Sequence, residues 1–525
     1  MQLRHFLESV KPAHVEGPTA IDVTGLAFEA RLVKPGMAFF ALKTAQGEGD
    51  NEIERAIDRG AAVIVCEQRR HFKNKAVVAQ VPDIRIALAR AADAFFGHPS
   101  SKLMVIGVIG EYGRASVAFL LKQILEKAGL KTGLAGRMGC EIGERRLPAN
   151  ASDPESLEIQ ALLDHMVKAG CQAAVIEVGA KGIENSQVAG VHFNALVHVS
   201  AFAAACPGKP LSETKAERTF RKLFESQPAS TRSVSSLIEI REQPAGDAGS
   251  EMAAVIRHGP GRKAVWQARK AEFKRDGLRL ETTLGEREII LETPVIGREN
   301  AGRLLAALSA AYTLGFSVEA IQLAARALKN PPGSLEMVSS SQKFGVYIDG
   351  GRSQADLRKT LRLLREITPG RILIAFGCGA GHSAEARFEM GEIAAALADF
   401  TIITTDNPAN EPPAGIAADV ERGFCNIRNT SYRVETDRAR AIAEIIVRAK
   451  PGDAVLIAGK GLETTQRIED AIIPFDDREH AKACLRPGIR SGPRLAKTGH
   501  RLKPEESREP QPKPRESAAF HETSP

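Results

Sequence analysis

The stretch GVIGEYGRAS at residues 107–116 decides how the sequence folds. The apolar run at 103–109 predicts a buried strand, and the helical pattern at 117–128 predicts a helix after it. A strand, a glycine turn and a helix are the setting of a phosphate-binding loop, because backbone N–H groups and the helix N-terminus then face an anion. Such loops end in Gly-Lys-Ser or Gly-Lys-Thr, whereas this one ends in Gly-Arg-Ala at 113–115. It is therefore either a nucleotide site with altered chemistry or a loop that keeps only its structural role.

Short apolar runs alternate with helical patterns on both sides of this stretch, which predicts an α/β protein. The runs AAVIEVGA at 173–180 and FNALVHVSAF at 193–202 are typical of parallel strands buried on both faces. The breaker NPPG at 330–333 indicates a domain boundary. We predict an N-terminal domain, a central domain, a C-terminal domain and a tail, at residues 1–100, 101–331, 332–486 and 487–525.

The composition favours a globular protein of a reducing compartment. Of the 525 residues, 43% are hydrophobic, which supplies apolar material for several cores. The seven cysteines are scattered and form no CxxC or Cys/His cluster, so we expect free thiols rather than a zinc site. The sequence has no secretory signal and no apolar run long enough to span a bilayer, so we expect a cytoplasmic protein without membrane insertion.

The formal net charge is +7, and much of the basic excess lies near the C-terminus. Segment 487–525 is rich in proline and charge and poor in apolar residues, so we expect it to be disordered. Aromatic residues make up only 5% of the chain, which weakens any model of base stacking. Nucleic-acid binding through the tail is therefore the least favoured hypothesis.

Four longer motifs narrow the class of protein. AGKGLETTQ at 458–466 and IPFDDRE at 473–479 resemble the C-terminal signature of the Mur ligases. ASDPESLEIQALL at 151–163 and VIGRENAGRLLAAL at 295–308 resemble the central domain of that family. The resemblance extends in order over about residues 20–485 and points to the MurE-type synthetases, which add the third amino acid, often diaminopimelate, to UDP-MurNAc-Ala-Glu.

The resemblance implies a three-domain Mur-ligase architecture with a central P-loop-like domain and a C-terminal Rossmann-like domain. It also implies a reaction in which ATP, with Mg²⁺, phosphorylates a substrate carboxylate, and an amino-acid amine then attacks the acyl phosphate. Such a transition state needs fixed cations and N–H donors around the transferred phosphoryl group. The positions that supply these contacts in the family therefore decide whether this chain can catalyse the reaction.

The positions that match the nucleotide contacts of the family are only partly retained. The resemblance assigns cofactor binding to Gly110, Gly113, Arg114, Ser116, Asn300 and Asp349. Arg114 replaces the loop lysine and keeps a positive charge, but its planar fork does not reproduce a compact ammonium. Ala115 replaces a hydroxyl residue and offers no oxygen to Mg²⁺, and Ser334 replaces the arginine that reaches the γ-phosphate.

The metal and substrate positions are also altered. Glu177, at the end of a predicted strand, is the candidate metal ligand that the resemblance leaves. The carbamylated lysine of the family matches Phe220, and ligands of a following loop match alanines at 203–205. The arginine that pairs with the carboxylate of the incoming amino acid is Ala409, so a bidentate partner is lost. The retained substrate-binding candidates are Arg31, Asp406, Asn407 and Glu463.

Residues that build turns are thus kept, while residues that contact Mg²⁺, the γ-phosphate and the amino acid are repeatedly replaced. We interpret the chain as a degenerate paralogue linked to peptidoglycan precursor synthesis, which binds a UDP-MurNAc-peptide or a cell-wall enzyme partner. The alternative is an active ATP-dependent acid–amino-acid ligase with a rebuilt site. If the glycine loop serves packing alone, replacing Arg114 with alanine should change the stability little.

Overall fold

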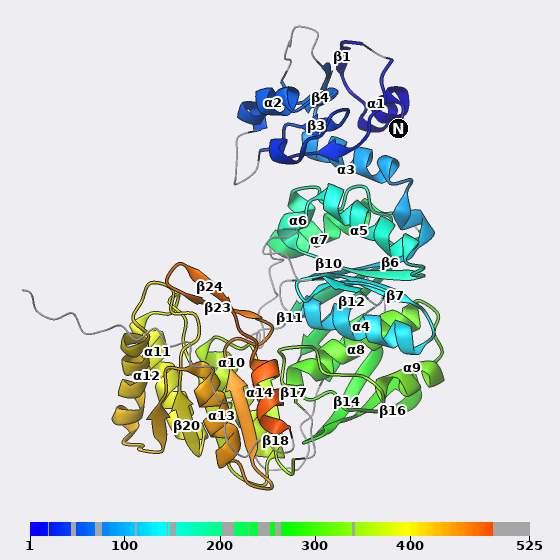
Figure 1. The fold of residues 1–525 in the computed structure, drawn as a ribbon. Coiled ribbons are helices and arrows are strands. Elements are labelled where there is room, and N and C mark those ends of the chain that lie inside the picture. Colours follow the sequence, from blue (N-terminus) through cyan, green and yellow to red (C-terminus); the bar gives the residue numbers. More distant parts are fainter. Residues whose placement is uncertain are drawn as a thin grey trace, which may run out of the picture.

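The computed structural model describes residues 1–18, 20–43, 49–68, 76–110, 113–143, 145–147, 154–201, 215–228, 230–239, 253–257, 264–338 and 342–486. The tail at 487–525 and the replaced loop ligands at 203–205 lie outside these residues. The described part contains a five-stranded, an eleven-stranded and a six-stranded sheet, each with its own helices, and a separate two-stranded hairpin (Figure 1). This confirms the predicted α/β class.

The first unit is the five-stranded sheet with its helices. Its strands lie in the order β1-β5-β4-β3-β2, and all neighbours are parallel except β1 and β5. The strands are β1 (His14–Glu16), β2 (Leu26–Ala27), β3 (Ala38–Phe40), β4 (Val63–Cys66) and β5 (Val77–Gln80). The helices are α1 (Leu3–Val10), η1 (Ala30–Leu32), α2 (Gly49–Asp58), α3 (Ile84–Phe95) and η2 (Pro99–Lys102). Strand β4 is apolar and wholly buried, as expected of a strand covered on both faces.

The central unit is built on the eleven-stranded sheet. Its order is β16-β15-β14-β13-β12-β11-β6-β10-β7-β8-β9, in which β12, β11, β6, β10 and β7 are parallel and the outer strands are antiparallel. The strands are β6 (Met104–Gly110), β7 (Thr132–Gly136), β8 (Gly139–Ile142), β9 (Arg145–Leu147), β10 (Ala173–Val178), β11 (Ala195–Ala201), β12 (Arg232–Glu239), β13 (Ala253–Arg257), β14 (Ala264–Lys274), β15 (Gly277–Leu284) and β16 (Arg287–Thr293). The predicted parallel strands are therefore confirmed as β10 and β11.

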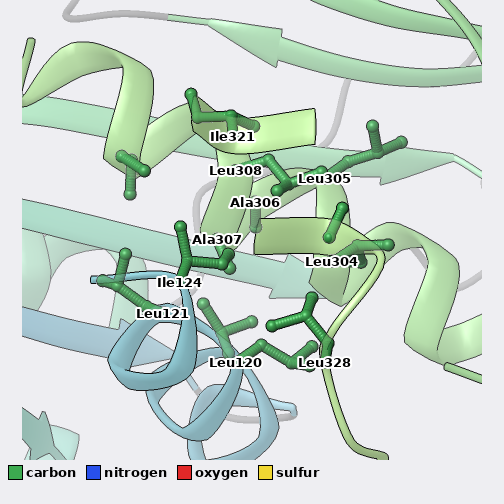
Figure 2. Close-up of a cluster of buried hydrophobic side chains, with 14 of the residues drawn as sticks. Leu120, Leu121, Ile124, Leu304, Leu305, Ala306, Ala307, Leu308, Ile321 and Leu328 are labelled. Atoms are coloured by element: carbon green, nitrogen blue, oxygen red, sulfur yellow. The ribbon is translucent and has the colours of Figure 1, made fainter. Parts of the chain in front are cut away.

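Helices cover both faces of this sheet. They are α4 (Arg114–Lys127), α5 (Ser156–Lys168), α6 (Ala180–Glu184), α7 (Lys215–Glu225), α8 (Arg298–Thr313) and α9 (Val318–Ala325). One apolar cluster joins α4, α8 and α9 to the sheet, and a second joins α5 and α7 to its other face. Figure 2 shows the first cluster, with labelled members Leu120, Leu121, Ile124, Leu304, Leu305, Ala306, Ala307, Leu308, Ile321 and Leu328. This packing fixes α4, and with it the glycine turn that precedes the helix.

The third unit is a doubly wound sheet in the order β17-β18-β22-β19-β20-β21, parallel except for β17. Its strands are β17 (Glu336–Met337), β18 (Gly345–Asp349), β19 (Ile372–Phe376), β20 (Phe400–Ile403), β21 (Tyr432–Val434) and β22 (Ala454–Ala458). Helices α10 (Gln354–Ile367), α11 (Ala384–Leu397) and α12 (Pro413–Ile427) pack on one face, and α13 (Arg438–Arg448) and α14 (Asp477–Leu485) pack on the other. The hairpin is formed by β23 (Thr465–Ile468) and β24 (Ala471–Pro474).

Each of the first three predicted segments contains one large sheet. The boundaries 1–100, 101–331 and 332–486 themselves stay a prediction. Among the residues that the structure describes, no helix is both long and apolar enough to cross a membrane.

Candidate functional site

The glycine turn of the opening stretch lies between β6 and α4. Gly110 ends the strand with φ +151°, and a Cβ there would lie 2.2 Å from the carbonyl oxygen of Val199 on the neighbouring strand β11. Gly113 has φ +75° and stands immediately before the first residue of α4. Both glycines are therefore required by the backbone geometry, whatever the turn binds. The two residues between them, 111 and 112, lie outside the described part of the chain.

Arg114 points back into the turn. Its Nε donates to Glu177 Oε1 at 2.7 Å, and its Nη1 donates to the carbonyl oxygen of Gly110 at 2.8 Å. The arginine side chain is 14% exposed and the glutamate side chain 3%. Glu177 reaches the turn because β10 runs parallel to β6, with Glu177 in register with Val108. The cation expected to contact phosphate is thus paired with the carboxylate expected to hold a metal.

The Glu177 carboxylate has a partner on each oxygen. Its Oε2 accepts a hydrogen bond from the backbone N–H of Arg137 at 2.8 Å, and a Cβ on Gly136 would lie 2.6 Å from the same atom. A divalent cation prefers several oxygen ligands. Among the described residues, no group of three or more His, Cys, Asp or Glu side chains is placed to hold a metal ion. The side chains present at this turn therefore do not fit the Mg²⁺ that the family resemblance implies.

Phe220, at a replaced position, is apolar and buried, and it lies on α7 near this turn. Phe220 is 4% exposed, and its ring centroid lies 5.1 Å from that of His198 on β11. Lys222, two residues further along α7, is exposed. Ser116 is 6% exposed in the first turn of α4. The position that the resemblance matches to the carbamylated lysine of the family thus makes an aromatic contact in this structure.

Arg303 of α8 is a residue of this turn that sequence reasoning missed. A Cβ on Gly113 would lie 2.9 Å from its Nε. Its Nη1 donates to Asn300 Oδ1 at 2.9 Å and to Ser334 Oγ at 3.2 Å, and its Nη2 donates to Glu299 Oε2 at 2.8 Å. The signal was a single arginine within an otherwise apolar helical run. Two arginines thus flank the glycine turn, and each is paired with a glutamate.

Asn300, the expected adenine contact, uses its whole hydrogen-bonding capacity within the protein. The side chain is 1% exposed. Its amide nitrogen donates to the carbonyl oxygens of Ile296 at 2.8 Å and Ser334 at 3.3 Å. Its oxygen accepts from Arg303 and from the Ser334 hydroxyl. An asparagine amide has two donors and two acceptor sites, so none is free for a base.

Asp349, the expected ribose contact, has a similar internal role. Its Oδ1 accepts from the backbone N–H of Gly351 at 2.9 Å, and its Oδ2 accepts from the N–H of Leu335 at 3.0 Å. Burial raises the pKa of the Asp349 carboxyl, and the two backbone hydrogen bonds oppose this shift. The residue joins the end of β18 to the segment that enters the third unit.

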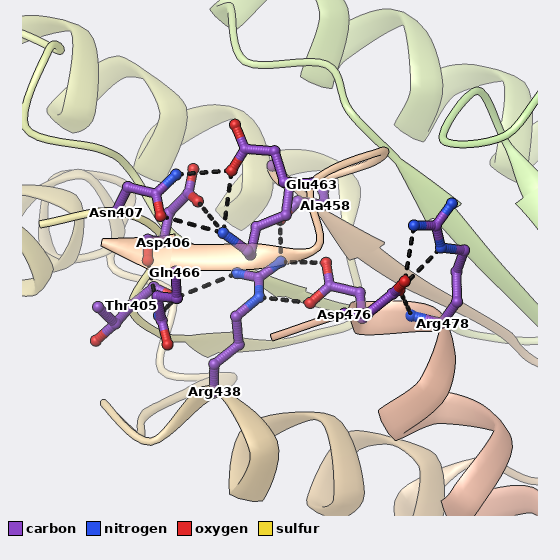
Figure 3. Close-up of polar contacts among 12 residues, drawn as sticks. Thr405, Asp406, Asn407, Arg438, Ala458, Glu463, Gln466, Asp476 and Arg478 are labelled. Atoms are coloured by element: carbon purple, nitrogen blue, oxygen red, sulfur yellow. Dashed lines mark hydrogen bonds and ion pairs between the residues drawn. The ribbon is translucent and has the colours of Figure 1, made fainter. Parts of the chain in front are cut away.

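The substrate candidates of the third unit do meet, at the edge where its parallel strands end (Figure 3). Asn407 Nδ2 donates to Glu463 Oε2 at 2.7 Å. Lys460, which sequence reasoning did not select, donates from Nζ to Asn407 Oδ1 at 3.1 Å and to Glu463 Oε2 at 3.0 Å. Its Nζ also lies 3.6 Å from Asp406 Oδ1. Lys460 and Asp406 are each 2% exposed, whereas the Glu463 side chain is 34% exposed, so the charged network is buried at one end and reaches the surface at the other.

Arg352 completes the network from the loop after β18. It donates from Nε to the carbonyl oxygen of Gly459 at 3.1 Å and from Nη2 to Glu463 Oε1. Burial raises the pKa of the Glu463 carboxyl, but hydrogen bonds from Arg352, Asn407 and Lys460 outweigh burial, and the pKa lies below its ordinary value. The carboxylate is therefore held ionised by partners from three loops.

Arg31 is not brought to either cluster. It lies on η1 of the first unit and donates from Nε to Glu29 Oε2 at 2.5 Å. Its side chain is 73% exposed. Figure 1 places this unit beyond the central sheet, on the far side from the third unit. The candidates therefore lie in separate places: Arg31 is exposed on the first unit, Arg114 and Glu177 pair at the glycine turn, and Asp406, Asn407 and Glu463 meet in the third unit.

Comparisons with known proteins agree with this architecture. The family model described as the Mur ligase middle domain matches residues 108–311, and the Mur ligase glutamate ligase domain matches residues 335–461. A UDP-N-acetylmuramoyl-L-alanyl-D-glutamate–2,6-diaminopimelate ligase of Gloeobacter violaceus is 34% identical over 474 residues, covering 89% of this chain and 94% of the relative. The ligase of the same name from Geobacillus thermodenitrificans is 32% identical over 470 residues, covering 89% of this chain and 95% of the relative.

Solved structures show the same fold. A structure of a UDP-N-acetylmuramoyl-L-alanyl-D-glutamate–2,6-diaminopimelate ligase superposes with a TM-score of 0.64 at 21% identity, over 91% of this chain and 98% of the other. A MurF ligase of Thermotoga maritima, solved in complex with ADP, gives 0.50 at 16% identity, over 88% of this chain and 96% of the other. Sequence and fold therefore agree over most of the molecule, and this chain belongs to the Mur ligase family.

Proposed function

We propose that this chain is a Mur-family protein of peptidoglycan precursor synthesis that has lost, or nearly lost, the ability to join an amino acid to its substrate. Its role is to bind a UDP-MurNAc-peptide or a cell-wall enzyme through the retained fold. The observation that carries the proposal is the buried pair of Arg114 and Glu177.

Because Arg114 and Glu177 bind each other, neither charge is available to a phosphate or a metal ion. Catalysis of phosphoryl transfer depends on cations fixed where negative charge develops. The Arg114 guanidinium instead neutralises Glu177 and satisfies the carbonyl of Gly110. A nucleotide that used the Arg114 charge, or a metal ion that used Glu177, would have to separate this pair, and leaving one partner of a buried ion pair alone costs about 3–5 kcal/mol. The turn is thus stable without a ligand and poorly suited to one.

The saturated polar groups further along the site support the same proposal. Asn300 and Asp349 spend their hydrogen bonds on the protein itself. At the position of the bridging lysine, Phe220 is buried and offers no charge. ATP and Mg²⁺ are the cofactors of the proposed ancestral reaction, and these side chains do not provide for them.

The second candidate function is an active ligase that adds an amino acid such as diaminopimelate to UDP-MurNAc-Ala-Glu. Two observations favour it. The curated relatives named above carry ligase names and align over nearly their whole length. The network of Asp406, Asn407, Lys460 and Glu463 also keeps charged groups at the edge of the third sheet.

A product assay separates the two candidates. The purified chain is incubated with Mg-ATP, UDP-MurNAc-dipeptide and a set of amino acids, and mass spectrometry is used to search for the amide product. The Geobacillus thermodenitrificans protein, which carries the diaminopimelate ligase name, is assayed in parallel as the comparison enzyme. We expect no amide product and no phosphate release above that of a heat-inactivated sample. Amide formation by the unmodified chain would establish the second candidate.

A further inference from the structure

The junction between the central and third units is more extensive than a simple linker. The segment 326–335 connects α9 to β17, and the first turn of α8 lies against its end, where Asn300 bonds to Ser334. Domains joined by a short segment are expected to move relative to each other unless their interface is large or specifically bonded. The contacts of α8 therefore decide whether the third unit can move relative to the central unit.

Arg298, the first residue of α8, binds both units. Its guanidinium carbon lies 4.9 Å from the ring centroid of Phe273, on β14 of the central unit. Its Nη2 donates to both carboxylate oxygens of Glu366, on α10 of the third unit, at 3.1 and 2.8 Å. Phe273 itself packs against the apolar clusters of both units. The arginine is thus held between an aromatic ring on one side and a carboxylate on the other.

Glu299, Asn300 and Arg303 of α8 also form contacts across the junction. Glu299 Oε1 accepts from Lys359 Nζ of α10 at 3.2 Å, while its Oε2 accepts from Arg303. Arg303 donates to the Ser334 hydroxyl, and Asn300 bonds to both the hydroxyl and the carbonyl oxygen of Ser334. Four residues within the first two turns of α8 therefore contact Ser334, Lys359 or Glu366.

The connecting segment is itself wedged into the third unit. Gly333 has φ +66°, and a Cβ there would lie 2.7 Å from the backbone nitrogen of Leu462. The carbonyl oxygen of Gly333 accepts from the N–H of Gly350 at 2.8 Å. Beyond it, the buried Tyr347 of β18 donates its hydroxyl to the carbonyl oxygen of Arg275, in the turn between β14 and β15. Rotation of the third unit would break these contacts together.

We propose that the first two turns of α8 form a latch that fixes the third unit on the central unit. The latch consists of Arg298, Glu299, Asn300 and Arg303 with their partners Ser334, Lys359 and Glu366. Because Arg303 also lies against Gly113, the latch connects the glycine turn to the third unit. It holds the two units in one orientation without any ligand, and this inference does not depend on whether the chain is a ligase.

Hydrogen exchange tests the latch in the full chain. The backbone amides of Leu335 and Gly350 lie at the junction and are bonded to Asp349 Oδ2 and to the carbonyl oxygen of Gly333. Arg298→Ala and Arg303→Ala should each speed exchange at these amides by roughly tenfold, because local opening becomes easier. Amides inside β22 should keep their rates, since that strand lies in the core of the third unit.

A charge swap and a matched control complete the experiment. Arg298→Glu should speed exchange at the junction, and Arg298→Glu combined with Glu366→Arg should restore slow exchange. Arg287→Ala removes an exposed arginine that, within the described residues, forms an ion pair with Glu319 of the central unit, and it should leave the junction unchanged. The latch is refuted if junction exchange in both alanine variants equals that of the Arg287 control, or if the swap exchanges as fast as Arg298→Glu alone.

Discussion

Replacing Arg114 with alanine should destabilise the central unit substantially. Among the described residues, the substitution leaves the Glu177 carboxylate, whose side chain is 3% exposed, with the backbone N–H of Arg137 as its hydrogen-bond donor. Leaving one member of a buried ion pair alone typically costs about 3–5 kcal/mol. Because one hydrogen bond to the carboxylate persists, we expect the lower end, about 3 kcal/mol. This replaces the expectation from sequence that the loss would be small.

Urea unfolding followed by fluorescence measures this loss. The chain has one tryptophan, Trp266, which is 1% exposed in β14 and so reports on the central unit. With an m-value of about 3 kcal/mol per molar urea, the midpoint should fall by about 1 M. Adding Glu177→Gln to Arg114→Ala should recover much of the loss, because no charge is then left buried.

The control for this prediction is Arg326→Ala. Arg326 is an exposed arginine whose contact with Glu292 is 3.8 Å long. Such a pair is worth at most about 1 kcal/mol, so its midpoint should stay close to that of the unmodified chain. A midpoint for Arg114→Ala no lower than that of Arg326→Ala would refute the claim that the pair with Glu177 is a buried structural contact.

Three further predictions follow from the same contacts. The double variant Arg114→Lys with Ala115→Thr should show some Mg-dependent ATP binding in calorimetry but should form no amide product. Amide formation by this variant would contradict the functional losses assigned to Phe220, Ser334 and Ala409. Gly110→Ala should unfold the central unit at markedly lower urea, because the new Cβ would lie 2.2 Å from the Val199 carbonyl oxygen; an unchanged midpoint would show that β11 can move aside. The lowered pKa of Glu463 means that its network stabilises the fold at neutral pH and that this contribution is lost as the pH falls from its ordinary value through the lowered one. Unfolding midpoints measured against pH should therefore fall less steeply in acid for Glu463→Gln, and equal slopes would contradict the assignment.

Much of the fold could be predicted from the sequence because buried parallel strands consist of continuous apolar runs. The runs at 173–180 and 193–202 correspond to β10 and β11, and the glycine turn predicted within 107–116 lies between β6 and α4. The antiparallel strands β13 to β16 were not predicted. Strands with one solvated face, such as β16, mix polar and apolar residues and give a weaker signal than buried ones.

The candidate site was predictable as a set of positions but not as a set of contacts. The motif positions Asp406, Asn407 and Glu463 do meet, because parallel strands bring their ends to one edge. The pairing of Arg114 with Glu177 and the approach of Arg303 to Gly113 depend on side-chain direction and helix packing, which spacing does not encode. The cofactor, metal and substrate roles of the candidates stay predictions.

Calorimetric titration of the unmodified chain with ATP, with and without Mg²⁺, tests the central claim most directly. If Arg114 and Glu177 satisfy each other inside the glycine turn, no Mg-dependent binding should be detected at nucleotide concentrations up to the millimolar range. A micromolar dissociation constant that is lost when Mg²⁺ is removed would contradict the account, because it would show that the turn still holds a nucleotide with its metal.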